Sequence, residues 1–593
     1  MTAEEQTKLD LDPRACMQLY LEGQHKELAQ CFIDLLQKFA AAVYYELDEQ
    51  TTHFVNVFAK NFLYFFTQPD FLPHENQSRC FVELNPVICN VVAMSEFRTT
   101  DAYLAMLLRQ PRNFAKTLAL YNPRCHTRLN RKVFFDANVE LASLWYIVNF
   151  TNYRVGSAAY NTWQHLREHM YDIDQRLMPV SVHVPHAYFG VTYIDNERDH
   201  ELKRVINAGF KAWTHAPPIH NKPDKKKILI VTNMWHKGHS VYRCMHAFLR
   251  ALAQDYELSL LSLGQALEAL DVELFEGRVH TFALHDPKRD YSVLANNEFQ
   301  LVFFPDIGMN IESIALANLR IAPIQVCGYG HPVSTFGAQI DYWLGGGGET
   351  EDETAYETNY DERLVLIPGA GVMPNRPLYE RRSLARPSDR IRIGCPWTGQ
   401  KINYPLLQTL ARIDERSERD IIFEFYPSGA LVSGGFSQLR RDVYEVLDEH
   451  SVHIIGNLHY PSYMAHMETC QLTLDSYPFG GYATATDALF LHRPMVTREG
   501  GKFYNRSAAS LLRACGLHEL ITHSEGAYIE TAVRLIDDDA FRLGLINRLR
   551  SLDLDKELFA DRSSQQFKQA ITYLIENHQA LKTSGDRRPL RFI

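Results

Sequence analysis

The sequence has few of the residue patterns that hold small, metal-bound or membrane-spanning folds together. Its ten cysteines are scattered and none forms a C-x-x-C pair, so a zinc site or a disulfide framework is not expected. No run of 18 apolar residues is long enough to cross a bilayer, and the acidic, polar start MTAEEQTKLD is unlike a signal peptide. We therefore expect a soluble, cytoplasmic protein with no membrane partner and no bound metal.

A strong excess of charge is also absent. The formal net charge of −10 over 593 residues is too small for a surface that coats a polyanion, so no nucleic-acid partner is expected. The hydrophobic content of 46% and the charged content of 22% are those of a globular protein. At roughly 150 residues per domain, the chain is long enough for three or four compact units.

The glycine-rich runs do not match a P-loop. The run from Gly345 to Gly348 lacks the lysine and the spacing of that motif, and the acidic ETEDETAYE that follows would repel phosphate. We interpret this run as a flexible turn. The segment EGGK at residues 499–502 fails the same template.

Residues 1–220 have the pattern of an all-α domain. Apolar side chains recur at helical spacing from Leu28 to Val43 and again from Val55 to Phe66. No 34-residue self-similarity is visible, so tetratricopeptide-type repeats are not predicted. The stretch HAPPIHNKPDKKK, at residues 215–227, holds three prolines and a lysine run and is typical of a linker.

From Ile228 the pattern changes to short β-rich runs separated by amphipathic, helix-length segments. Runs such as ILIVT, LVFFP and PIQVCGY come first, and a basic, proline-bearing junction at residues 374–390 precedes a new series, IRIGCP, IIFEFY and LTLDS. This alternation predicts parallel sheets with crossover helices. We therefore predict an α/β fold of the GT-B kind, in which two Rossmann-like domains face a cleft, at residues 225–378 and 388–593, after the all-α domain.

The most informative turn lies in residues 472–497, LTLDSYPFGGYATATDALFLHRPMVT, which predict a strand, a loop, a helix and a second strand. Thr484, Thr486 and Asp487 fall in the first turn of the predicted helix, where free backbone N–H groups and the helix dipole favour an anion. A loop that leaves the carboxyl end of a parallel strand is where open α/β sheets bind nucleotides. An ordinary βα turn is the alternative.

Two other predicted strands end in histidine-bearing turns. After ILIVTN, His236 and His239 come just before a helix, where a histidine can accept or donate a proton, or can simply cap the helix. After PIQVCGY, His331 lies between Gly330 and Pro332 in a turn whose amides can hold a pyrophosphate. A plain turn explains the second group of residues equally well.

A lysine follows the first strand of the predicted carboxyl-terminal domain. In TGQKINYP, Asn403 and Pro405 can start a helix, which leaves Lys401 on the loop before it. A lysine at that place can set its charge against a diphosphate and neutralise a departing nucleotide without a metal. The alternative is a solvated lysine.

Together, these segments resemble a known family. PIQVCGYGHP…DYWL, TGQKINYP and LDSYPFGGYATATDALFLHRPMVTREGGKFYNRSAASLLRACGLHELI look like glycosyltransferase family 41, which contains eukaryotic O-GlcNAc transferase and bacterial cytoplasmic N-glycosyltransferases that modify adhesins. NPVICNVVAMSEFRTTDAYLAMLL and FFDANVELASLWYIVNF are similar to the all-α domain of the bacterial group. The resemblance implies a GT-B fold, a UDP-sugar donor that is usually UDP-glucose, and inverting transfer with neither metal nor cofactor.

The resemblance also implies which residues bind the donor. Lys401 matches the lysine on the donor diphosphate, and Asp487 matches the aspartate on the ribose. Thr484 and Thr486 would lie along the phosphates. Tyr463, in HYPSYMAHM, falls where the family places a ring against uracil.

By the same resemblance, two histidines belong to the reaction centre. His239 matches a histidine near the acceptor and the donor sugar, and His331 lies in the turn beside it. Gly330 and Pro332 would shape that turn around the donor. The predicted catalytic residues are therefore His239, His331 and Lys401.

Two departures from the family pattern leave the donor sugar open. The bacterial group often carries Asn-Thr-Asn-Gly before the aspartate, whereas this chain has Gly481-Tyr482-Ala483-Thr484. Where a glutamine after the strand IIFEFY helps to choose the sugar, this chain has Ser428 and Gly429.

The expected function is that of an inverting protein glycosyltransferase. It would move a hexose, with glucose as the first choice, from a UDP-sugar to asparagine in Asn-x-Ser/Thr segments of a cytoplasmic polypeptide, such as an adhesin before its export. One alternative is transfer to Ser/Thr hydroxyls or to a protein-bound sugar. Another is a partner-binding protein that uses the same fold without catalysis.

Overall fold

The computed structural model of the chain divides into two compact units, described here one at a time. The helical unit comprises Met1–Ile194, Thr398–Ala411 and Tyr426–Leu458, and the sheet unit comprises Asp195–Trp397, Arg412–Phe425 and His459–Ile593. The residues that the structure describes are 11–42, 47–109, 113–195, 197–213, 222–264, 270–282, 292–295, 297–330, 333–347, 354–382, 390–427, 435–456 and 458–593.

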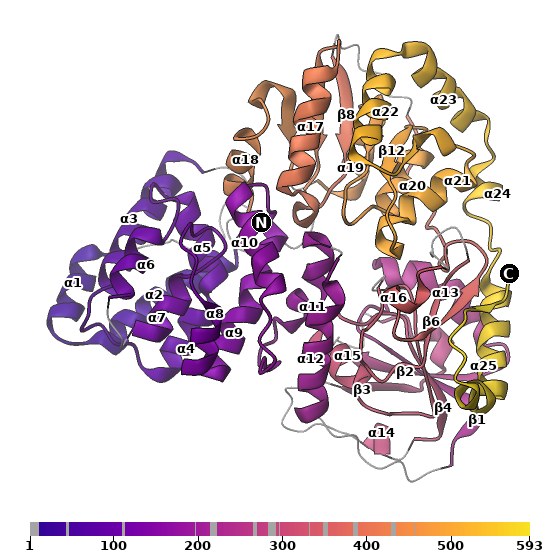
Figure 1. The fold of residues 1–593 in the computed structure, drawn as a ribbon, viewed down its shortest axis with the longest axis horizontal. Helices are drawn as coiled ribbons and strands as arrows, with labels where there is room; N and C mark the ends of the chain where they lie inside the picture. The colour runs from indigo at the N-terminus through magenta and orange to yellow at the C-terminus, as the bar shows by residue number, and fades with distance from the viewer. Residues whose placement is uncertain are drawn as a thin grey trace. The chain divides into compact units, whose positions relative to one another are not determined.

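The amino-terminal part of the helical unit is a succession of α-helices, as its apolar periodicity predicts (Figure 1). In chain order they are α1 (Pro13–Leu21), α2 (His25–Ala40), α3 (Glu49–Phe66), α4 (Glu75–Glu83), α5 (Asn85–Met94), α6 (Asp101–Leu107), α7 (Phe114–Leu120), α8 (Arg131–Ala137), α9 (Val139–Asn149), α10 (Tyr160–Tyr171) and α11 (Val184–Ile194). The unit also holds the 3-10 helix η2 (Phe150–Val155), α18 (Gly435–Tyr444), β10 (Val452–Ile454) and the start of α17 (Tyr404–Arg416).

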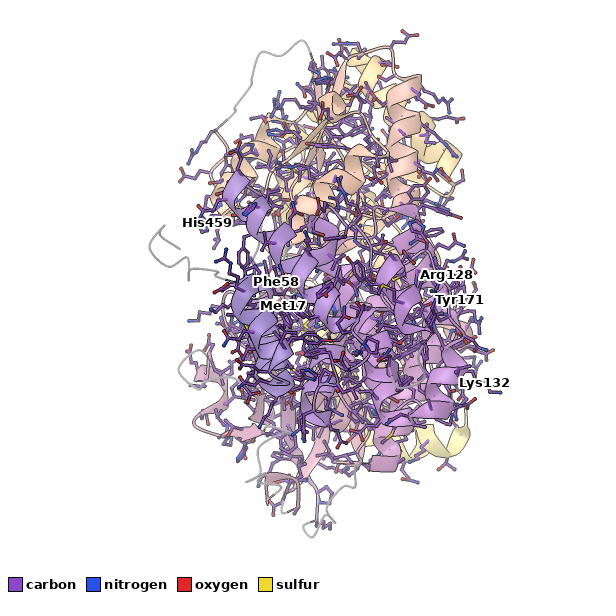
Figure 2. The ribbon with its side chains drawn as sticks, turned by 90° about the vertical axis from the view of Figure 1, so that its left-hand side faces the viewer. Met17, Phe58, Arg128, Lys132, Tyr171 and His459 are labelled. Atoms are coloured by element: carbon purple, nitrogen blue, oxygen red, sulfur yellow. The ribbon has the colours of Figure 1, made fainter. Side chains whose placement is uncertain are left out.

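Aromatic rings fill the core between α2 and α3. Phe62 packs against Phe66 with ring centroids 4.9 Å apart and against Phe32 at 5.5 Å, the latter edge to face. Phe58 is only 1% exposed, whereas Met17 of α1 is 37% exposed, and both are labelled in Figure 2. Aromatic side chains bury a large apolar area each, so this stack stabilises the first three helices.

Buried polar contacts join α18 to the amino-terminal helices. Arg124 forms a two-pronged ion pair with Asp442, in which the Nη1–Oδ1 distance is 3.2 Å. Gln438 Nε2 donates to Asn90 Oδ1 at 3.0 Å, and both side chains are buried. Because a buried pair is costly to break at one partner only, these contacts specify how α18 packs within the unit.

The first sheet of the sheet unit is parallel and runs in the order β14-β7-β6-β5-β4-β1-β2-β3. The strands are β1 (Asp224–Thr232), β2 (Glu257–Leu263), β3 (Val279–Phe282), β4 (Phe299–Phe304), β5 (Ile324–Cys327), β6 (Tyr342–Gly346), β7 (Arg363–Ile367) and β14 (Leu590–Arg591). The helices of this part are α12 (Asp199–Trp213), α13 (Ser240–Leu252), α14 (Ser292–Ala295), α15 (Ile311–Ala317) and α16 (Tyr356–Asn359). Crossover helices are what a parallel sheet requires.

The second sheet of this unit is also parallel and runs in the order β9-β8-β11-β12-β13. Its strands are β8 (Ile391–Cys395), β9 (Ile421–Phe425), β11 (Leu472–Leu474), β12 (Met495–Arg498) and β13 (Ile521–Thr522). The helices that follow are α19 (Tyr460–Thr469), α20 (Ala483–Phe490), α21 (Ser507–Ala514), α22 (Glu525–Asp537), α23 (Asp539–Ser551), α24 (Leu554–Glu557) and α25 (Ser564–Ser584). Two parallel sheets in succession confirm the predicted fold class.

The last helix returns to the first sheet. Phe567 of α25 stacks on Phe248 at 5.0 Å and meets Phe303 of β4 edge to face at 5.5 Å. The chain then ends in β14, in which Leu590 pairs with Val365 of β7. The sequence pattern predicted the helices but not this final strand, which is only two residues long.

The prediction of a flexible turn at the glycine run is wrong for its first two residues. Gly345 and Gly346 continue β6 and pair with Leu366 and Ile367. A Cβ at Gly371 would lie 2.5 Å from the carbonyl carbon of Gly345, so another stretch of backbone passes directly against the strand. Close approach of two backbones, rather than a turn, accounts for the glycines.

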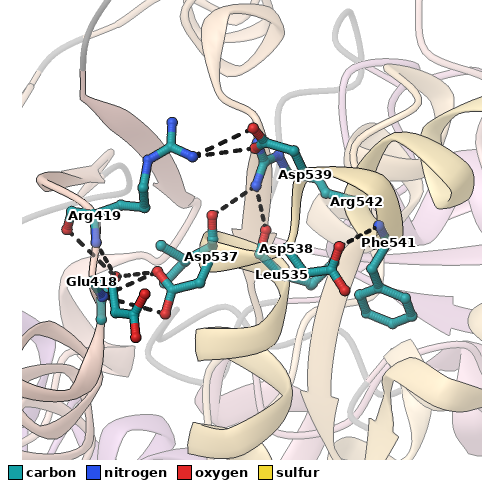
Figure 3. A network of polar contacts seen from close by, with 10 residues as sticks. Glu418, Arg419, Leu535, Asp537, Asp538, Asp539, Phe541 and Arg542 are labelled. Atoms are coloured by element: carbon teal, nitrogen blue, oxygen red, sulfur yellow. Dashed lines mark hydrogen bonds and ion pairs between the residues drawn. The ribbon is translucent and has the colours of Figure 1, made fainter.

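A polar network attaches α22 and α23 to the loop before β9 (Figure 3). Arg419 Nη1 lies 3.4 Å from both carboxylate oxygens of Asp539, and the Glu418 amide donates to Asp537 Oδ1 at 3.1 Å. The buried Arg542 donates to the carbonyl oxygen of Leu535 at 2.6 Å, which caps the end of α22. Exposed pairs such as Arg419–Asp539 contribute at most about 1 kcal/mol, so the buried cap matters more.

No helix in the described part of the chain is long and apolar enough to span a membrane.

The aromatic core between α2 and α3 predicts a large effect for one substitution. Phe32 is 0% exposed, so Phe32→Ala would leave a cavity and lower the free energy of unfolding by about 3–5 kcal/mol. Leu21, at 75% exposure in α1, is the matched control, and Leu21→Ala should change it by less than about 0.5 kcal/mol. Urea unfolding measures both, and equal losses for the two variants would contradict the core described here.

Candidate active site

The loop between β11 and α20 is held in shape by one carboxylate. Asp475 is 4% exposed, and its Oδ1 accepts hydrogen bonds from the amides of Ser476 at 2.9 Å and Gly481 at 2.7 Å. Its Oδ2 accepts from the hydroxyl of Thr497 on the neighbouring strand β12 at 2.7 Å. Three hydrogen bonds to one buried carboxyl group hold residues 475–482 in a defined, rigid loop. We call these residues the site loop.

The strand, loop, helix and strand predicted for residues 472–497 are confirmed, and Gly481 explains how closely the loop meets the helix. A Cβ at Gly481 would lie 2.3 Å from Thr484 Oγ1, so a larger residue there would require the Thr484 side chain to move. Thr484 is half-buried in the first turn of α20, whose amides have no acceptor within the helix. This turn can therefore bind an anion.

The two threonines of α20 differ in what their hydroxyls can do. Thr486 is 2% exposed, and its Oγ1 donates to the carbonyl oxygen of Tyr482 at 2.9 Å. Its hydroxyl proton is therefore used inside the helix, whereas Thr484 lies at the open end. Asp487, the fifth residue of α20, lies one position beyond the first turn.

Asp487 is a buried carboxyl group that accepts the hydroxyl of a tyrosine from α19. It is 7% exposed, and Tyr460 donates its hydroxyl to Oδ1 at 2.6 Å. Burial raises the pKa of Asp487 to about 6, against the hydrogen bond from Tyr460 and the positive charge of Arg243. Tyr463 was predicted from the sequence, whereas Tyr460, which precedes it by three residues on the same helix, was not.

His239 caps the amino terminus of α13, and this role decides its hydrogen-bonding state. Its Nδ1 accepts the Val241 amide at 3.2 Å. Burial, with help from the charges of His236 and Arg243, lowers the pKa of His239 to about 4, so the ring is neutral at pH 7. A neutral ring that accepts at Nδ1 carries its proton on Nε2, and Nε2–H is then a hydrogen-bond donor.

Arg243 is a basic residue of the site that the sequence analysis missed. It is exposed, and its charge acts on both Asp487 and Tyr460. Its spacing of four residues from His239 puts the two on the same face of α13, and that spacing was the available signal. Arg243, on helix α13 beside the first sheet, therefore places a positive charge near Asp487, whose helix α20 lies beside the second sheet.

The turn after β5 contacts the second sheet through aromatic rings. The Tyr329 ring lies 5.5 Å from that of Tyr482, the residue before α20, and 5.3 Å from that of Phe503. The Gly330 amide donates to the carbonyl oxygen of Pro305 at 2.7 Å. His331 and Pro332, predicted for this turn, lie outside the described residues, as do Ser428 and Gly429.

A second buried acid, Asp306, lies at the same edge of the first sheet. It is 0% exposed, its Oδ1 accepts the Thr232 hydroxyl, and its Oδ2 has no hydrogen-bond partner in the described part of the chain. A Cβ at Gly330 would lie 2.4 Å from the Asp306 Cβ, so the turns after β4 and β5 touch. Burial raises the pKa of Asp306 to about 7. The signal that sequence reasoning passed over is an aspartate directly after the apolar run LVFFP.

Lys401 lies in the helical unit, on a short segment with a well-held backbone. It ends the 3-10 helix Gly399–Lys401, and its amide donates to the carbonyl oxygen of Thr398 at 2.9 Å. The side chain of Asn403 accepts the Leu406 amide at 3.0 Å and so caps α17, as predicted. Ser157 forms a parallel bridge with Asn403, which fixes the backbone on both sides of that cap.

Metal-ligating residues do not cluster in the part of the chain that the structure describes, where no group of three His, Cys, Asp or Glu side chains could hold an ion.

Replacing the buried acid Asp487 should stabilise the protein in a pH-dependent way. Burial raises its pKa from 3.8 to about 6, so its contribution is complete at acid pH and is lost as the pH rises through about 6. The advantage of Asp487→Asn should therefore grow between pH 4 and pH 7, to on the order of 3 kcal/mol. Urea unfolding at both pH values measures it, with Asp420→Asn, at an exposed carboxylate, as the control. An advantage that is larger at pH 4 would contradict the assignment.

The part of the chain around α20 is similar to a known protein family. Residues 464–568 match the model of a family described as glycosyl transferase family 41. The matched segment contains the site loop, α20 and Asp487.

Two relatives differ in how much of the chain they cover. A UDP-glucose:protein N-beta-glucosyltransferase of Actinobacillus pleuropneumoniae serotype 5b is 24% identical over 497 residues, which are 77% of this chain and 78% of that protein. A probable UDP-N-acetylglucosamine–peptide N-acetylglucosaminyltransferase of Petunia hybrida, SPINDLY, is 25% identical over 249 residues, which are 39% of this chain and 25% of that protein.

Among solved structures, an O-GlcNAc transferase of Thermobaculum terrenum has a similar fold. The TM-score is 0.59 at 18% sequence identity, and the match covers 94% of this chain and 99% of that one. The family model matches residues 464–568, the Actinobacillus relative is similar over most of the chain, and the solved structure shares its fold.

Proposed function

We propose that this protein is an inverting glycosyltransferase that moves a hexose, specifically glucose, from a UDP-sugar to the side-chain amide of asparagine in Asn-x-Ser/Thr segments. The observation that carries the proposal is the rigid site loop, which leads from the end of β11 to the open first turn of α20 and to the buried Asp487. The curated relative that covers 77% of the chain is named a UDP-glucose:protein N-beta-glucosyltransferase, which supports glucose and a protein acceptor.

The donor would bind to the first turn of α20. Its free amides and the Thr484 hydroxyl suit the diphosphate, whose charge the helix dipole also favours. The Asp487 carboxylate, whose Oδ1 accepts the Tyr460 hydroxyl, would also accept a ribose hydroxyl, as the family resemblance implies. Lys401 would place its charge on the diphosphate and Tyr463 would lie near the uracil, as the family resemblance implies.

The reaction forms a bond between the asparagine nitrogen and the anomeric carbon and breaks the bond from that carbon to the β-phosphate oxygen. The negative charge that develops on UDP would be stabilised by the α20 amides and Lys401, so no metal or other cofactor is invoked. The asparagine nitrogen loses one proton, which a basic group of the site or the departing UDP would take up, and an amide is a poor nucleophile until such a group polarises it.

The geometry of His239 restricts the part that it can play in this reaction. With Nδ1 bound to the Val241 amide, the resting ring donates from Nε2 and suits a phosphate or sugar oxygen. His239 would have to release Val241 before it could take up a proton. His331 completes the proposed catalytic set.

The proposed acceptor is an unfolded or extended polypeptide in the cytoplasm, such as an adhesin before export. Proximity in the active site supplies much of the rate, because a bound amide and a bound sugar no longer need to meet by diffusion. The proposal includes neither a nucleic-acid nor a membrane partner.

One observation favours a second candidate function. The Petunia hybrida relative is named for transfer of N-acetylglucosamine to peptide and matches 249 residues of this chain. Transfer to Ser/Thr hydroxyls or to a protein-bound sugar is therefore the alternative reaction. A partner-binding protein without catalysis would share the fold but would turn over no donor.

A panel of donors tests the proposed reaction directly. The protein is incubated with UDP-glucose, UDP-galactose or UDP-N-acetylglucosamine and an Asn-x-Thr peptide, and intact mass is recorded. We expect one added hexose, from UDP-glucose above the others, and no product with a matched Gln-x-Thr peptide. Addition of an N-acetylhexosamine that alkaline β-elimination removes would instead establish the O-linked alternative.

Lys401→Ala tests the proposed diphosphate contact. Loss of one positive charge on the leaving group should lower turnover by about 10²–10³-fold. Lys60→Ala, at an exposed lysine of the same unit, is the matched control and should leave turnover unchanged. Urea unfolding should shift by less than about 1 kcal/mol in both variants. An unchanged rate for folded Lys401→Ala would remove this lysine from the site.

A further inference from the structure

Helix α12 holds a loop of the first sheet with its carboxyl-terminal half. The Asn207 side chain donates to the carbonyl oxygens of Thr335 at 2.7 Å and Phe336 at 3.0 Å, and Lys211 donates to the carbonyl oxygen of Gly337. These carbonyls belong to the loop between β5 and β6. Side-chain donors on the helix and main-chain acceptors on the loop therefore hold the two together and restrict the movement of one against the other.

The first residue of α12 contacts the second sheet instead. Asp199 is 0% exposed, forms an ion pair with Lys502 and accepts the hydroxyl of Tyr504 at 3.3 Å. Burial opposes ionisation of this carboxyl group, but His200, Lys203 and Lys502 together hold its pKa below the ordinary value. The negative charge of Asp199 is thus offset by positively charged and hydrogen-bonding side chains close to it.

The ring of Phe336 lies close to both lysines of this cluster. Lys203 Nζ lies 5.6 Å and Lys502 Nζ 6.0 Å from the ring centroid. Burial lowers the pKa of Lys203 to about 7, so at neutral pH it is a weaker counter-ion than an ordinary lysine. Lys502, with 16% of its side chain exposed, is the partner that contacts Asp199 directly.

Tyr504 transmits this contact to the site loop. Its ring stacks on Phe479 at 5.2 Å with an interplanar angle of 10°, and its carbonyl oxygen accepts the Gly480 amide at 2.8 Å. The neighbouring Phe503 packs on Tyr329, which in turn packs on Tyr482 just before α20. Residues 502–504 therefore contact the site loop by backbone and by side chain.

We propose that Asp199 is a positioning residue for the donor: through Lys502 and Tyr504 it holds the site loop in the form that binds the UDP moiety. The inference rests on the proposed function and assigns to it a residue about 290 positions away in the sequence from the donor helix. Asp199 touches neither Thr484 nor Asp487. Its effect passes through the hydrogen bond from Gly480 to Tyr504 and the stack on Phe479.

Asp199→Asn removes the charge and keeps the size of the side chain. We expect the KM for UDP-glucose and the Kd for UDP, by calorimetry, to rise about 10-fold, while kcat changes less than about threefold, because a contact that shapes the ground-state site acts equally on the transition state. Lys502→Met should have the same effect, and the double variant should lose no more than either single one.

Arg204→Gln is the matched control. Arg204 lies on the same helix, and its guanidinium is 5.5 Å from the same Phe336 ring, but its ion pair is with Asp361 at 2.9 Å and not with Lys502. This variant should leave the Kd for UDP unchanged. Tyr504→Phe removes only the hydroxyl bond to Asp199 and should raise the Kd about threefold, the size of one hydrogen bond, even if Asp199→Asn folds poorly.

Hydrogen exchange of the ligand-free protein gives a readout that does not depend on activity. Amides of residues 475–487 should exchange faster in Asp199→Asn than in the native protein and at the native rate in Arg204→Gln. If the native protein binds no UDP, the proposed function fails and this inference fails with it. If the native protein binds UDP while Asp199→Asn shows the native Kd and native exchange, the proposed function stands and only the role of Asp199 is overturned.

Discussion

The carboxylate of Asp475 accepts hydrogen bonds from two loop amides and from the Thr497 hydroxyl on the next strand, and the candidate site depends on this arrangement. Without it, the site loop would have several free backbone donors and no fixed path into α20. With it, the amide of Gly481 turns inward and the first turn of the helix is left open. A buried, fully hydrogen-bonded carboxylate can specify a loop in this way because each donor lost would leave charge uncompensated.

The buried acids differ in how far hydrogen bonds and cations offset the cost of their burial. This difference separates the acids that hold the fold from those that can titrate. Asp475 and Asp199 are matched by donors or cations, so they act as fixed parts of the framework. Asp487 and Asp306 have raised pKa values, about 6 and about 7, because burial outweighs their hydrogen bonds. Buried acids that titrate close to neutral pH are typical of functional sites.

Much of the local structure could be predicted from the sequence. The alternation of apolar runs indicated the parallel sheets, the polar loop after Leu474 indicated the turn into α20, and Asn403 indicated the cap of α17. The prediction for Gly345 and Gly346 was wrong, because a run of glycines does not by itself distinguish close backbone packing from a flexible turn. Arg243 and Tyr460 were missed because each acts on Asp487 from another helix.

The sequence by itself determined the succession of helices and strands and the residue types at each strand end, because periodicity and turn chemistry act over a few residues. Only the tertiary structure decided what those residues do. It buried Asp487 against the Tyr460 hydroxyl, placed the charge of Arg243 near it and joined Asp199 to Lys502. Burial, hydrogen-bond partners and charge pairing depend on which distant segments meet, and no local pattern encodes that meeting.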